Sequence, residues 1–571
     1  MGNVGAVCKE PPRDREAENI VLPLIQTPRT PRTPRTPRRI ARPAQIRFCR
    51  RLLFEPSDRR VVTDVYQLGA TISTGSFGIV QEAWPAVDCK GGFQPLPPGT
   101  ECKPRLVVKS FTQESSASPY IWRAKRISFD VEQLSLAMLE HPHIVQLYHC
   151  FATLDDQVHL ALEFCKGGDL FSRVQAEGCL EESTASRIFW QMAITVSYIH
   201  GLHMIHQDLK MENWLLLDKS ADMVKLCDFG TVARLSQRQP RLLKPAGTLT
   251  YRAPEAHGGQ GVSFAADSWA LGVALYSMLI GKDPFLRSGD SRQDTINRLC
   301  AGEFGGTAPE SSSWLQLSEE SRDLISKLLV VDEFQRLSCV EAASHSWPTH
   351  PYPLIISLDK LGYLEQSGTR MLEYMECFTS LDPLQQLLLV TCARISSISE
   401  LVMLSPRSTA HARLPWYEMF MNWDQDRDGR LSFNELMRGL QPWVDRTSTQ
   451  LTSTFDAMDI DGSGYIEWAE WVGIELLEWV DIANGTALDN VLLSSAARLL
   501  DVSSCDGKIT VQDIAKFTPE KSTNETHQQL LSSLITDWAL DADRMPKDTS
   551  GLELADLQRM LEWSALFQSE V

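Results

Sequence analysis

The chain has 571 residues, of which 43% are hydrophobic and 22% are charged. This length exceeds what one hydrophobic core organises, so we expect several folded domains, and the composition excludes a fibrous or wholly disordered protein. No uncharged apolar run reaches the roughly 18 residues that span a bilayer, and the charged first residues are not a secretory signal. The 13 cysteines form no CxxC pair, which favours reduced thiols over disulfides or a zinc cluster.

Charge is distributed unevenly around the net value of −18. Residues 1–60 hold 14 Lys and Arg against six Asp and Glu, whereas residues 416–571 hold 11 against 28. The acidic C-terminal region is unsuited to nucleic acid, but its carboxylates can hold cations.

Residues 1–60 are predicted to be a disordered basic extension, because they lack periodicity and repeat Thr-Pro-Arg four times between 27 and 38. Two other interpretations stay open: a basic strip attracted to an anionic membrane, and a set of Thr-Pro phosphorylation sites. The N-terminus resembles a myristoylation signal at Gly2 with Cys8 as a palmitoylation candidate, although Ala6 replaces the preferred Ser or Thr. One acyl chain binds only marginally, so the repeat would be the second membrane signal.

The next segment changes from a β pattern to a helical one. Short β-rich runs span Leu68–Ile72, Phe77–Trp84 and Leu106–Phe111, with a Pro- and Gly-rich loop between the second and third. Helical runs follow after Trp122, at Ile127–Leu139, Thr184–His200, Phe264–Leu279, Thr295–Cys300 and Glu319–Leu329. A small β-rich part followed by a larger helical part indicates a two-lobed α+β domain.

A glycine-containing turn lies between the first two β-rich runs. Gly75 and Gly78 would let backbone amides close over phosphate oxygens, although Ser73 stands where a first glycine is usual. Lys109 ends the third apolar strand and Glu132 lies on the following helix. A buried strand lysine needs a counter-charge, and a helical glutamate is its natural partner.

An ordered set of motifs follows: His-Gln-Asp-Leu-Lys-Met-Glu-Asn at 206–213, Cys-Asp-Phe-Gly at 227–230, Gly247-Thr248, and Ala-Pro-Glu at 253–255. Together they resemble the eukaryotic protein kinases over residues 66–347. The resemblance implies catalytic roles for Asp208 and Lys210, and magnesium ligation by Asn213 and Asp228. It places the ATP contacts at Ile72, Gly75, Gly78, Val80, Lys109, Glu132, Glu163 and Cys165.

The resemblance also implies residues that hold the lobe together and select substrates. Glu255 would pair with Arg336, and Asp267 would anchor the catalytic loop. Asp169 and Glu212 fall near the expected peptide groove, where two carboxylates favour basic residues ahead of the target Ser or Thr.

Three departures from the kinase pattern affect how the domain is expected to work. Gln207 replaces the arginine before the catalytic aspartate, Val107 replaces an alanine in the lysine strand, and Met211 replaces a proline. Without that arginine there is no obvious receiver for an activation-loop phosphate, so we expect another form of control. A pseudokinase that acts as a calcium-dependent scaffold or binding protein is the alternative to an active enzyme.

Two twelve-residue segments fit the EF-hand calcium loop, and they begin 35 residues apart, at 424 and at 459. Their predicted ligands are Asp424, Asp426, Asp428, Arg430 and Glu435 in the first loop, and Asp459, Asp461, Ser463, Tyr465 and Glu470 in the second. Arg430 and Tyr465 would contribute backbone carbonyls. The mutual repulsion of the carboxylates makes a hard cation nearly necessary for order.

Two weaker loops, at 501–513 and 541–556, are EF-hand-shaped but poorly spaced, and we expect them to bind calcium poorly. The kinase-like region, a connector at 348–412, an EF-hand pair at 413–480 and a degenerate pair at 481–571 resemble the calcium-dependent protein kinases of plants and apicomplexan parasites. In that family the all-α EF-hand domain grips the connector when calcium binds. The candidate gripped helix is Pro383–Leu404, although it could equally be an ordinary core helix.

The expected function is a calcium-activated Ser/Thr protein kinase that uses ATP, Mg²⁺ and Ca²⁺. Its partners would be protein substrates and its own connector helix, with no role for nucleic acid. The expected location is cytoplasmic, with membrane association through the N-terminus left open.

Overall fold

The computed structural model describes residues 61–75, 78–85, 106–111, 119–152, 157–218, 222–243, 245–259, 261–304, 312–348, 361–381, 383–395, 416–441, 448–482, 500 and 509–510. The predictions for the N-terminal extension, its acylation and the two weaker calcium loops lie outside these residues, apart from residues 509–510 of the first weaker loop. Within them, no helix is long and apolar enough to cross a membrane.

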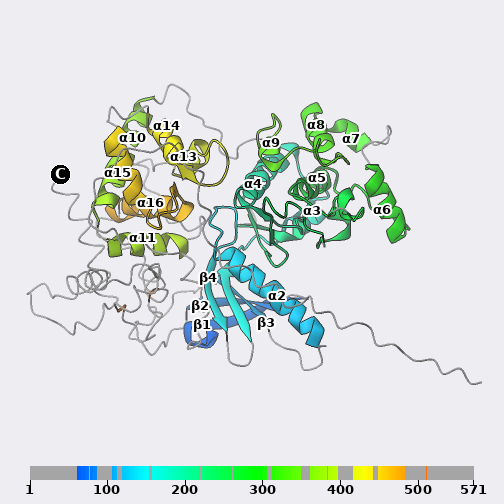
Figure 1. Ribbon diagram of the computed structural model, residues 1–571, viewed down its shortest axis with the longest axis horizontal. Coiled ribbons are helices and arrows are strands. Elements are labelled where there is room, and N and C mark those ends of the chain that lie inside the picture. The colour runs from blue at the N-terminus through cyan, green and yellow to red at the C-terminus, as the bar shows by residue number, and fades with distance from the viewer. Residues whose placement is uncertain are drawn as a thin grey trace, which may run out of the picture. The chain divides into compact units, whose positions relative to one another are not determined.

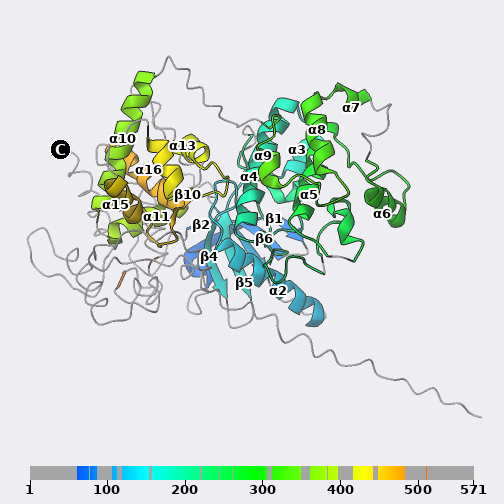
Figure 2. The same ribbon diagram turned by 45° about the horizontal axis from the view of Figure 1, so that its top comes forward.

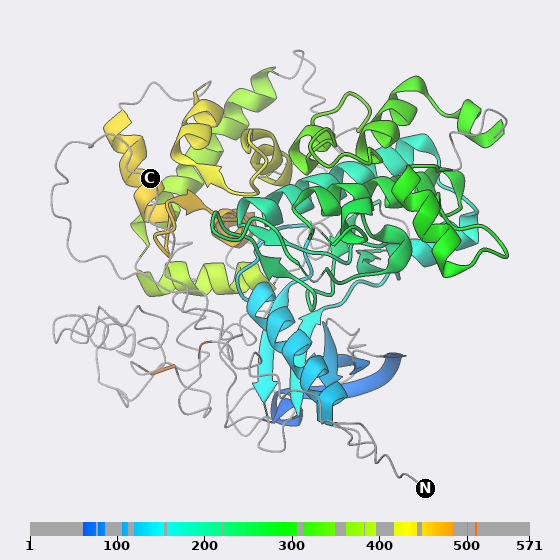
Figure 3. The same ribbon diagram turned by 45° about the vertical axis from the view of Figure 1, so that its right-hand side comes forward.

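A five-stranded antiparallel sheet begins the described fold, with strand order β1-β2-β3-β5-β4. The short helix α1 (Val62–Val65) precedes β1 (Tyr66–Gly75), β2 (Gly78–Pro85), β3 (Leu106–Phe111), β4 (Leu147–Ala152) and β5 (Val158–Glu163). Every residue of β3 and β5 is buried, and these two strands lie next to each other in the sheet. Helix α2 (Pro119–Leu136) contacts β4 and crosses the sheet (Figures 1 and 3).

Helix α2 begins eight residues before the predicted Ile127 and ends three residues before the predicted Leu139. Pro119 is suited to the first helical position, because its fixed φ matches the helix and its missing N–H would have no partner there. Residues 137–139 form a turn that leads to His141-Pro142, and a residue before proline is disfavoured in the helix.

The helical lobe follows, and its largest helices, α4 and α5, pack against each other (Figure 2). The helices are α3 (Leu170–Glu177), α4 (Glu182–Gly201), α5 (Ala265–Ile280), α6 (Arg292–Ala301), α7 (Ser312–Gln316), α8 (Glu319–Leu328) and α9 (Cys339–Ala343). Ser291 and Ser318 cap α6 and α8 by accepting backbone N–H groups in the first turn. Gly281 ends α5 with a φ of +73°, a conformation that suits glycine.

Two short two-stranded antiparallel sheets in this lobe position the functional loops. Strand β6 (Met204–Ile205) pairs with β9 (Ala233–Arg234), and β7 (Trp214–Leu216) pairs with β8 (Val224–Leu226). The 206–213 motif lies between β6 and β7, and the Cys-Asp-Phe-Gly motif directly follows β8. The pairing of β7 with β8 therefore brings the ends of these two motifs together.

The described residues between 361 and 482 are mostly helical. They contain α10 (Leu361–Ser380), α11 (Pro383–Ile395), α13 (Trp416–Trp423), α14 (Phe433–Leu440), α15 (Ser448–Met458) and α16 (Trp468–Ile482). A two-stranded ribbon of β10 (Leu431–Ser432) and β11 (Tyr465–Ile466) joins the two loop segments. The predicted fold class, a two-lobed α+β domain followed by an all-α region, is confirmed.

The connector helix predicted at Pro383–Leu404 is present as α11, and residues 396–404 lie outside the described part. Every residue from 384 to 393 is buried, so α11 is covered on all sides, as expected for an ordinary core helix. Helix α11 packs along α16, and α10 contacts both α15 and α16. The connector helices are therefore part of the same helical core as the calcium loops.

Candidate active site and calcium loops

Lys109 lies on the buried strand β3 and reaches across to helix α2. Its Nζ donates to both carboxylate oxygens of Glu132, at 2.7 and 2.6 Å, and lies 3.6 Å from Oδ1 of Asp228. Burial opposes a charged lysine, but the two carboxylates outweigh it and raise the pKa of Lys109. The structure thus joins three predicted site residues from a strand, a helix and a loop.

Asp208 lies in the loop between β6 and β7 and receives three side-chain or backbone donors. Lys210 Nζ donates to Oδ2 at 3.0 Å, while the backbone N and the Oγ1 of Thr248 donate to Oδ1 at 2.9 and 2.8 Å. Burial alone would raise the pKa of Asp208, but the hydrogen bonds from Lys210 and Thr248 lower it. The carboxylate is therefore ionised at neutral pH and can accept a hydroxyl proton.

Asn213 connects the catalytic loop to the segment that carries Asp228. Its Nδ2 donates to the backbone oxygen of Asp208 at 2.8 Å, and its own carbonyl accepts the N–H of Cys227 at 2.9 Å. Asp228 has a φ of +63°, which non-glycine residues seldom adopt, so the surrounding structure fixes its orientation. A carboxylate and an amide oxygen in this place suit Mg²⁺, which takes few protein ligands.

The glycine-containing turn is described at its two ends. Gly75 pairs with Gly78, and residues 76 and 77 lie outside the described part. Gly78 has a φ of +110°, and a Cβ at this position would lie 2.2 Å from the carbonyl oxygen of Ser110. Of the other predicted nucleotide contacts on these strands, Ile72 is about half exposed and Val80 is partly buried.

The predicted nucleotide contacts at the end of β5 differ in what their side chains do. Oε2 of Glu163 accepts from Lys225 Nζ at 2.8 Å, and both side chains are buried. The carboxylate of Glu163 is paired with Lys225. If Glu163 contacts the nucleotide as predicted, it therefore does so through its backbone groups. Cys165 is buried two residues further on, and burial raises the pKa of its thiol.

Asp267 anchors the catalytic loop from helix α5. Its two carboxylate oxygens accept the backbone N–H groups of His206 and Gln207, each at 2.9 Å, and Oδ2 lies 2.9 Å from Nε2 of His200. The carboxylate thereby holds Gln207 at a φ of +72°, just ahead of Asp208. This arrangement matches the anchoring role implied by the resemblance.

Gln207 also has a role that sequence reasoning did not identify. Its Nε2 donates to the carbonyl of Thr231, and its Oε1 accepts the N–H of Ala246 at 3.1 Å. One neutral side chain therefore joins the catalytic loop to two separate points of the 228–255 segment. An amide can bridge a carbonyl and an N–H in this way because it carries both a donor and an acceptor.

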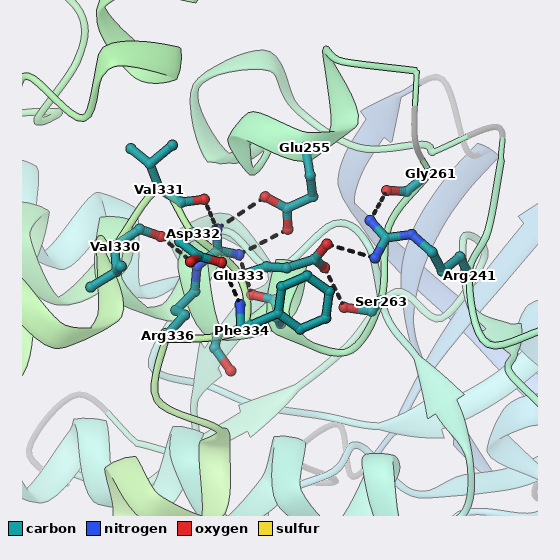
Figure 4. Close-up of polar contacts among 12 residues, drawn as sticks. Arg241, Glu255, Gly261, Ser263, Val330, Val331, Asp332, Glu333, Phe334 and Arg336 are labelled. Atoms are coloured by element: carbon teal, nitrogen blue, oxygen red, sulfur yellow. Dashed lines mark hydrogen bonds and ion pairs between the residues drawn. The ribbon is translucent and has the colours of Figure 1, made fainter.

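The pair of Glu255 and Arg336 forms as predicted (Figure 4). Two parallel hydrogen bonds, of 2.9 and 3.0 Å, join the guanidinium to the carboxylate, and the arginine side chain is fully buried. The same guanidinium donates to the carbonyl of Ala265 at 2.7 Å and lies 5.0 Å from the ring centre of Trp269. A buried bidentate pair with its remaining donors satisfied fixes this end of the segment.

A second arginine contact lies beside this pair and was not predicted (Figure 4). Nη1 of Arg241 lies 2.6 Å from Oε1 of Glu333, and Nη2 donates to the carbonyl of Gly261 at 2.7 Å. The hydroxyl of Ser263 donates to Oε2 of Glu333 at 2.8 Å. These contacts tie the middle of the 228–255 segment to the loop after α8 without a phosphate.

In the first calcium loop, the carboxylate oxygens of Asp424, Asp426 and Asp428 lie within 4.8 Å of one another. Burial and the neighbouring Asp428 raise the pKa of Asp424 to about 8. Glu435 reaches back to the start of the loop, where its Oε1 accepts the N–H of Gln425 at 2.9 Å. Buried carboxylates that converge repel one another when ionised, and a hard divalent cation between them would offset that repulsion.

The second loop repeats this arrangement. Oxygens of Asp459, Asp461 and Glu470 lie within 4.8 Å of one another, and burial together with Asp461 raises the pKa of Glu470. The hydroxyl of Ser463 donates to the carbonyl of Tyr465 at 3.2 Å, so both predicted ligands lie in the same turn. The donor set again consists of oxygens and fits Ca²⁺.

The two loops are paired through β10 and β11 and through a contact that the sequence did not reveal. Nη2 of Arg430 lies 2.6 Å from Oδ2 of Asp428, and the guanidinium lies 4.0 Å from the ring centre of Tyr465. Arg430 and Tyr465 occupy the same position in their respective loops, where each was predicted to offer its carbonyl. Their side chains make a cation–π contact instead of pointing to solvent independently.

Residues 105–348 match the family model of the protein kinase domain, and residues 417–440 and 451–473 match that of the EF hand. The chain contains a protein kinase domain followed by a pair of EF hands. These matches overlap the regions in which the motifs predicted a kinase domain and two calcium loops.

The chain is also similar to proteins named calcium-dependent protein kinase 3, from Plasmodium yoelii yoelii and Plasmodium berghei. Both are 28% identical over 66% of this chain, and the match covers 65% and 62% of their own length. Ribosomal protein S6 kinase alpha-2 of Mus musculus is 31% identical over 50% of this chain and 36% of its own. The resemblance to calcium-dependent kinases is confirmed, while the chain spans less than two thirds of these relatives.

Proposed function

We propose that this protein is a calcium-activated kinase that transfers the γ-phosphate of ATP to Ser or Thr of protein substrates. The observation that carries the proposal is the environment of Asp208: an ionised carboxylate that Lys210 and Thr248 hold in place. A degraded kinase lobe that served only as a scaffold would have no need for this arrangement.

The proposed nucleotide site uses Lys109, Asn213 and Asp228. Lys109 would face the phosphates, because its two carboxylate partners keep it charged inside the fold. Asn213 and Asp228 would hold Mg²⁺, which neutralises phosphate charge when it is bound. Val107 is buried in β3 and leaves the sheet regular, so the departure from alanine does not disrupt the strand that carries Lys109.

In the proposed reaction, Asp208 orients the acceptor hydroxyl and takes its proton as the oxygen attacks the γ-phosphorus. Lys210 lies next to this carboxylate and would stabilise the charge of the transferring group. Its own pKa is raised, because the hydrogen bond and charge of Asp208 outweigh its partial burial.

Calcium control is proposed to act through the connector. The paired loops precede α14 and α16, and α16 packs along the connector helix α11. A cation drawn between Asp459, Asp461 and Glu470 would change the start of α16, where Glu470 lies. Calcium can shift the equilibrium between two conformations only if it binds one of them more tightly than the other. The converging carboxylates of the loop supply that difference in affinity.

A preference for basic residues ahead of the target is proposed from Asp169 and Glu212. Glu212 is exposed beside the catalytic loop. Asp169 caps α3, since its oxygens accept the N–H and the hydroxyl of Ser172 at 2.7 and 2.8 Å, yet a carboxylate has further acceptor capacity.

We also propose a cytoplasmic location, with N-terminal acylation and the basic repeat as the route to a membrane.

The test is phosphate transfer from ATP and Mg²⁺ to a basic Ser/Thr peptide, with the full chain in calcium and in chelator. Transfer that depends on calcium is expected. No transfer in either condition would support the scaffold instead, and equal transfer in both would contradict calcium control.

A further inference from the structure

The hydroxyl of Ser128 joins helix α2 to the segment that carries Asp228. Its Oγ donates to the backbone carbonyl of Gly230 at 2.9 Å, and the serine is partly buried. Ser128 precedes Glu132 by four residues, so both side chains lie on the same face of α2. This face therefore holds two parts of the candidate active site, Lys109 through Glu132 and the Cys-Asp-Phe-Gly motif through Ser128.

The contact between Ser128 and Gly230 is tight. A Cβ at residue 230 would lie 2.3 Å from Oγ of Ser128 and 3.3 Å from its carbonyl oxygen, so the two segments approach this closely only because residue 230 is glycine. The same Cβ would lie 3.5 Å from Oδ1 of Asp228. A group added to the hydroxyl would therefore have to displace the segment that carries Asp228.

A phosphate on Ser128 would add charge where carboxylates already converge. It brings roughly two negative charges and three acceptor oxygens next to a carbonyl oxygen and one helical turn from Glu132. Lys109 is already bound to Glu132 and lies beside Asp228. A phosphate that attracted Lys109 would draw this cation away from the ATP site, and one that did not would repel the two carboxylates. Either outcome disassembles the site.

The residues ahead of Ser128 match the substrate preference proposed above. Arg123, Lys125 and Arg126 lie five, three and two residues ahead of the serine. The two carboxylates proposed to bind basic residues ahead of the target hydroxyl would recognise this pattern. One short segment thus combines a suitable acceptor with a position at which a phosphate disrupts catalysis.

We propose that Ser128 is a phosphorylation site of this kinase, modified by a second copy of the chain, and that the phosphate switches off the copy that carries it. The inference rests on the proposed function and on its preference for basic residues ahead of the target. Because the phosphate is covalent, this off state persists when calcium is bound.

The position of Ser128 within a helix sets the rate of its modification. A target hydroxyl enters the catalytic site of the second copy on an extended segment, so α2 has to unwind locally before transfer. The hydrogen bond to Gly230 and the pair of Lys109 with Glu132 oppose this unwinding, which makes the transfer slow. The added phosphate then prevents the helix from closing again.

The chemical step is an ordinary phosphoryl transfer. The serine Oγ forms a bond to the γ-phosphorus of ATP, and the bond from that phosphorus to the β–γ bridging oxygen breaks. The hydroxyl proton passes to Asp208 of the second copy and then to solvent, and ADP leaves with the bridging oxygen. The products are phosphoserine and ADP, with no further reactant.

The first experiment compares two peptides in transfer assays with the full chain in calcium. One has the sequence of residues 123–130, Arg-Ala-Lys-Arg-Ile-Ser-Phe-Asp, and the other has alanine at its three basic positions. The basic peptide should have a kcat/KM roughly 10- to 100-fold higher, the range expected for charged contacts. Transfer to the generic basic Ser/Thr peptide but not to residues 123–130 would overturn the inference alone. No transfer to any peptide would contradict the proposed function itself.

Mass spectrometry tests the site in the folded chain. An isotope-labelled Asp208→Asn chain is incubated with the unlabelled parent, ATP, Mg²⁺ and calcium. Phosphate should appear on Ser128 of the labelled chain and should be absent when the parent is omitted. A labelled chain that carries phosphate elsewhere but none on Ser128 would contradict the assignment.

Variants of α2 test the effect of the added charge. Ser128→Glu should lower kcat in calcium roughly 10- to 100-fold, the cost of misplaced catalytic groups. Ile127→Glu is the matched control, because it adds the same charge at a neighbouring position that is 44% exposed, and it should keep the parent activity. Equal activities of the two variants would contradict the inference.

A time course with ATP keeps the test decisive if Ser128→Glu fails to fold. The parent should lose activity in calcium as Ser128 becomes phosphorylated, and phosphatase should restore it. Ser128→Ala lacks the acceptor and should keep its activity over the same incubation. Parent chain that carries phosphate on Ser128 and remains fully active would overturn the proposed off state.

Discussion

The catalytic loop and the calcium loops handle buried charge in opposite ways. Around Asp208 and Lys109, each charge lies against an opposite charge or a hydrogen-bond donor, so the groups remain ionised without any ligand. In the calcium loops, carboxylates lie against carboxylates, and burial and repulsion raise the pKa values of Asp424 and Glu470. The first site is assembled by the chain alone, whereas the second has the converging carboxylates that fit a cation.

The largest expected effect comes from the assembled site. Asp208→Asn should lower phosphate transfer by roughly 10²- to 10⁴-fold, because an amide cannot take the hydroxyl proton. ATP affinity should change little, since the carboxylate serves the acceptor rather than the nucleotide. Single-turnover transfer and nucleotide titration separate these two effects. Transfer at the parent rate would show that another group is the base.

The calcium loops should respond to the loss of one carboxylate each. Glu435→Gln and Glu470→Gln remove a charge and a bidentate ligand, and each should weaken calcium binding at its own loop by roughly tenfold or more. Calorimetry on the full chain measures the affinity of both sites. Asp513→Asn and Asp556→Asn are the matched controls, because their loops are predicted to bind poorly. Four equivalent calcium ions would contradict this division.

A smaller effect is expected where the 228–255 segment is tied down. Arg241→Ala should lower kcat a few-fold by releasing the segment from Glu333, and Glu333→Gln should do the same. If the two act through one contact, the double variant should cost no more than the larger single change. Fully additive losses in a double-mutant cycle would show that Arg241 and Glu333 act separately.

The smallest effect should follow phosphatase treatment. Gln207 links the catalytic loop to Thr231 and Ala246 with a neutral side chain, so no phosphate is needed there. Activity in calcium should remain within about twofold of the untreated enzyme. Loss of activity, with recovery after incubation with ATP, would show that a phosphate does order the segment.

The sequence predicted those parts in which local chemistry determines position. The calcium loops carry their ligands within twelve consecutive residues, so their spacing located them. The motifs around Asp208 and Asp228 are short and ordered, so their resemblance to the protein kinases located them. One partner of Lys109 could be named because a buried lysine requires a carboxylate and the next helix offered Glu132.

Contacts between distant segments were less accessible to sequence reasoning. Arg241 and Glu333 are ordinary charged residues until folding brings their loops together, and the Arg430–Tyr465 contact depends on the pairing of β10 with β11. From the sequence, Gln207 was interpreted only as the loss of an arginine that would receive an activation-loop phosphate. Its two hydrogen bonds depend on backbone groups that no residue pattern reveals.

The most direct test of the account is phosphate transfer measured against free calcium for the parent chain and for the Glu435→Gln/Glu470→Gln double variant. The parent should be inactive in chelator and half-activated at roughly 10⁻⁷ to 10⁻⁵ M calcium, the range of sensor loops. The double variant should stay inactive at the calcium levels that activate the parent. Equal activity of the two proteins at every calcium concentration would contradict the claim that the calcium loops control the catalytic site.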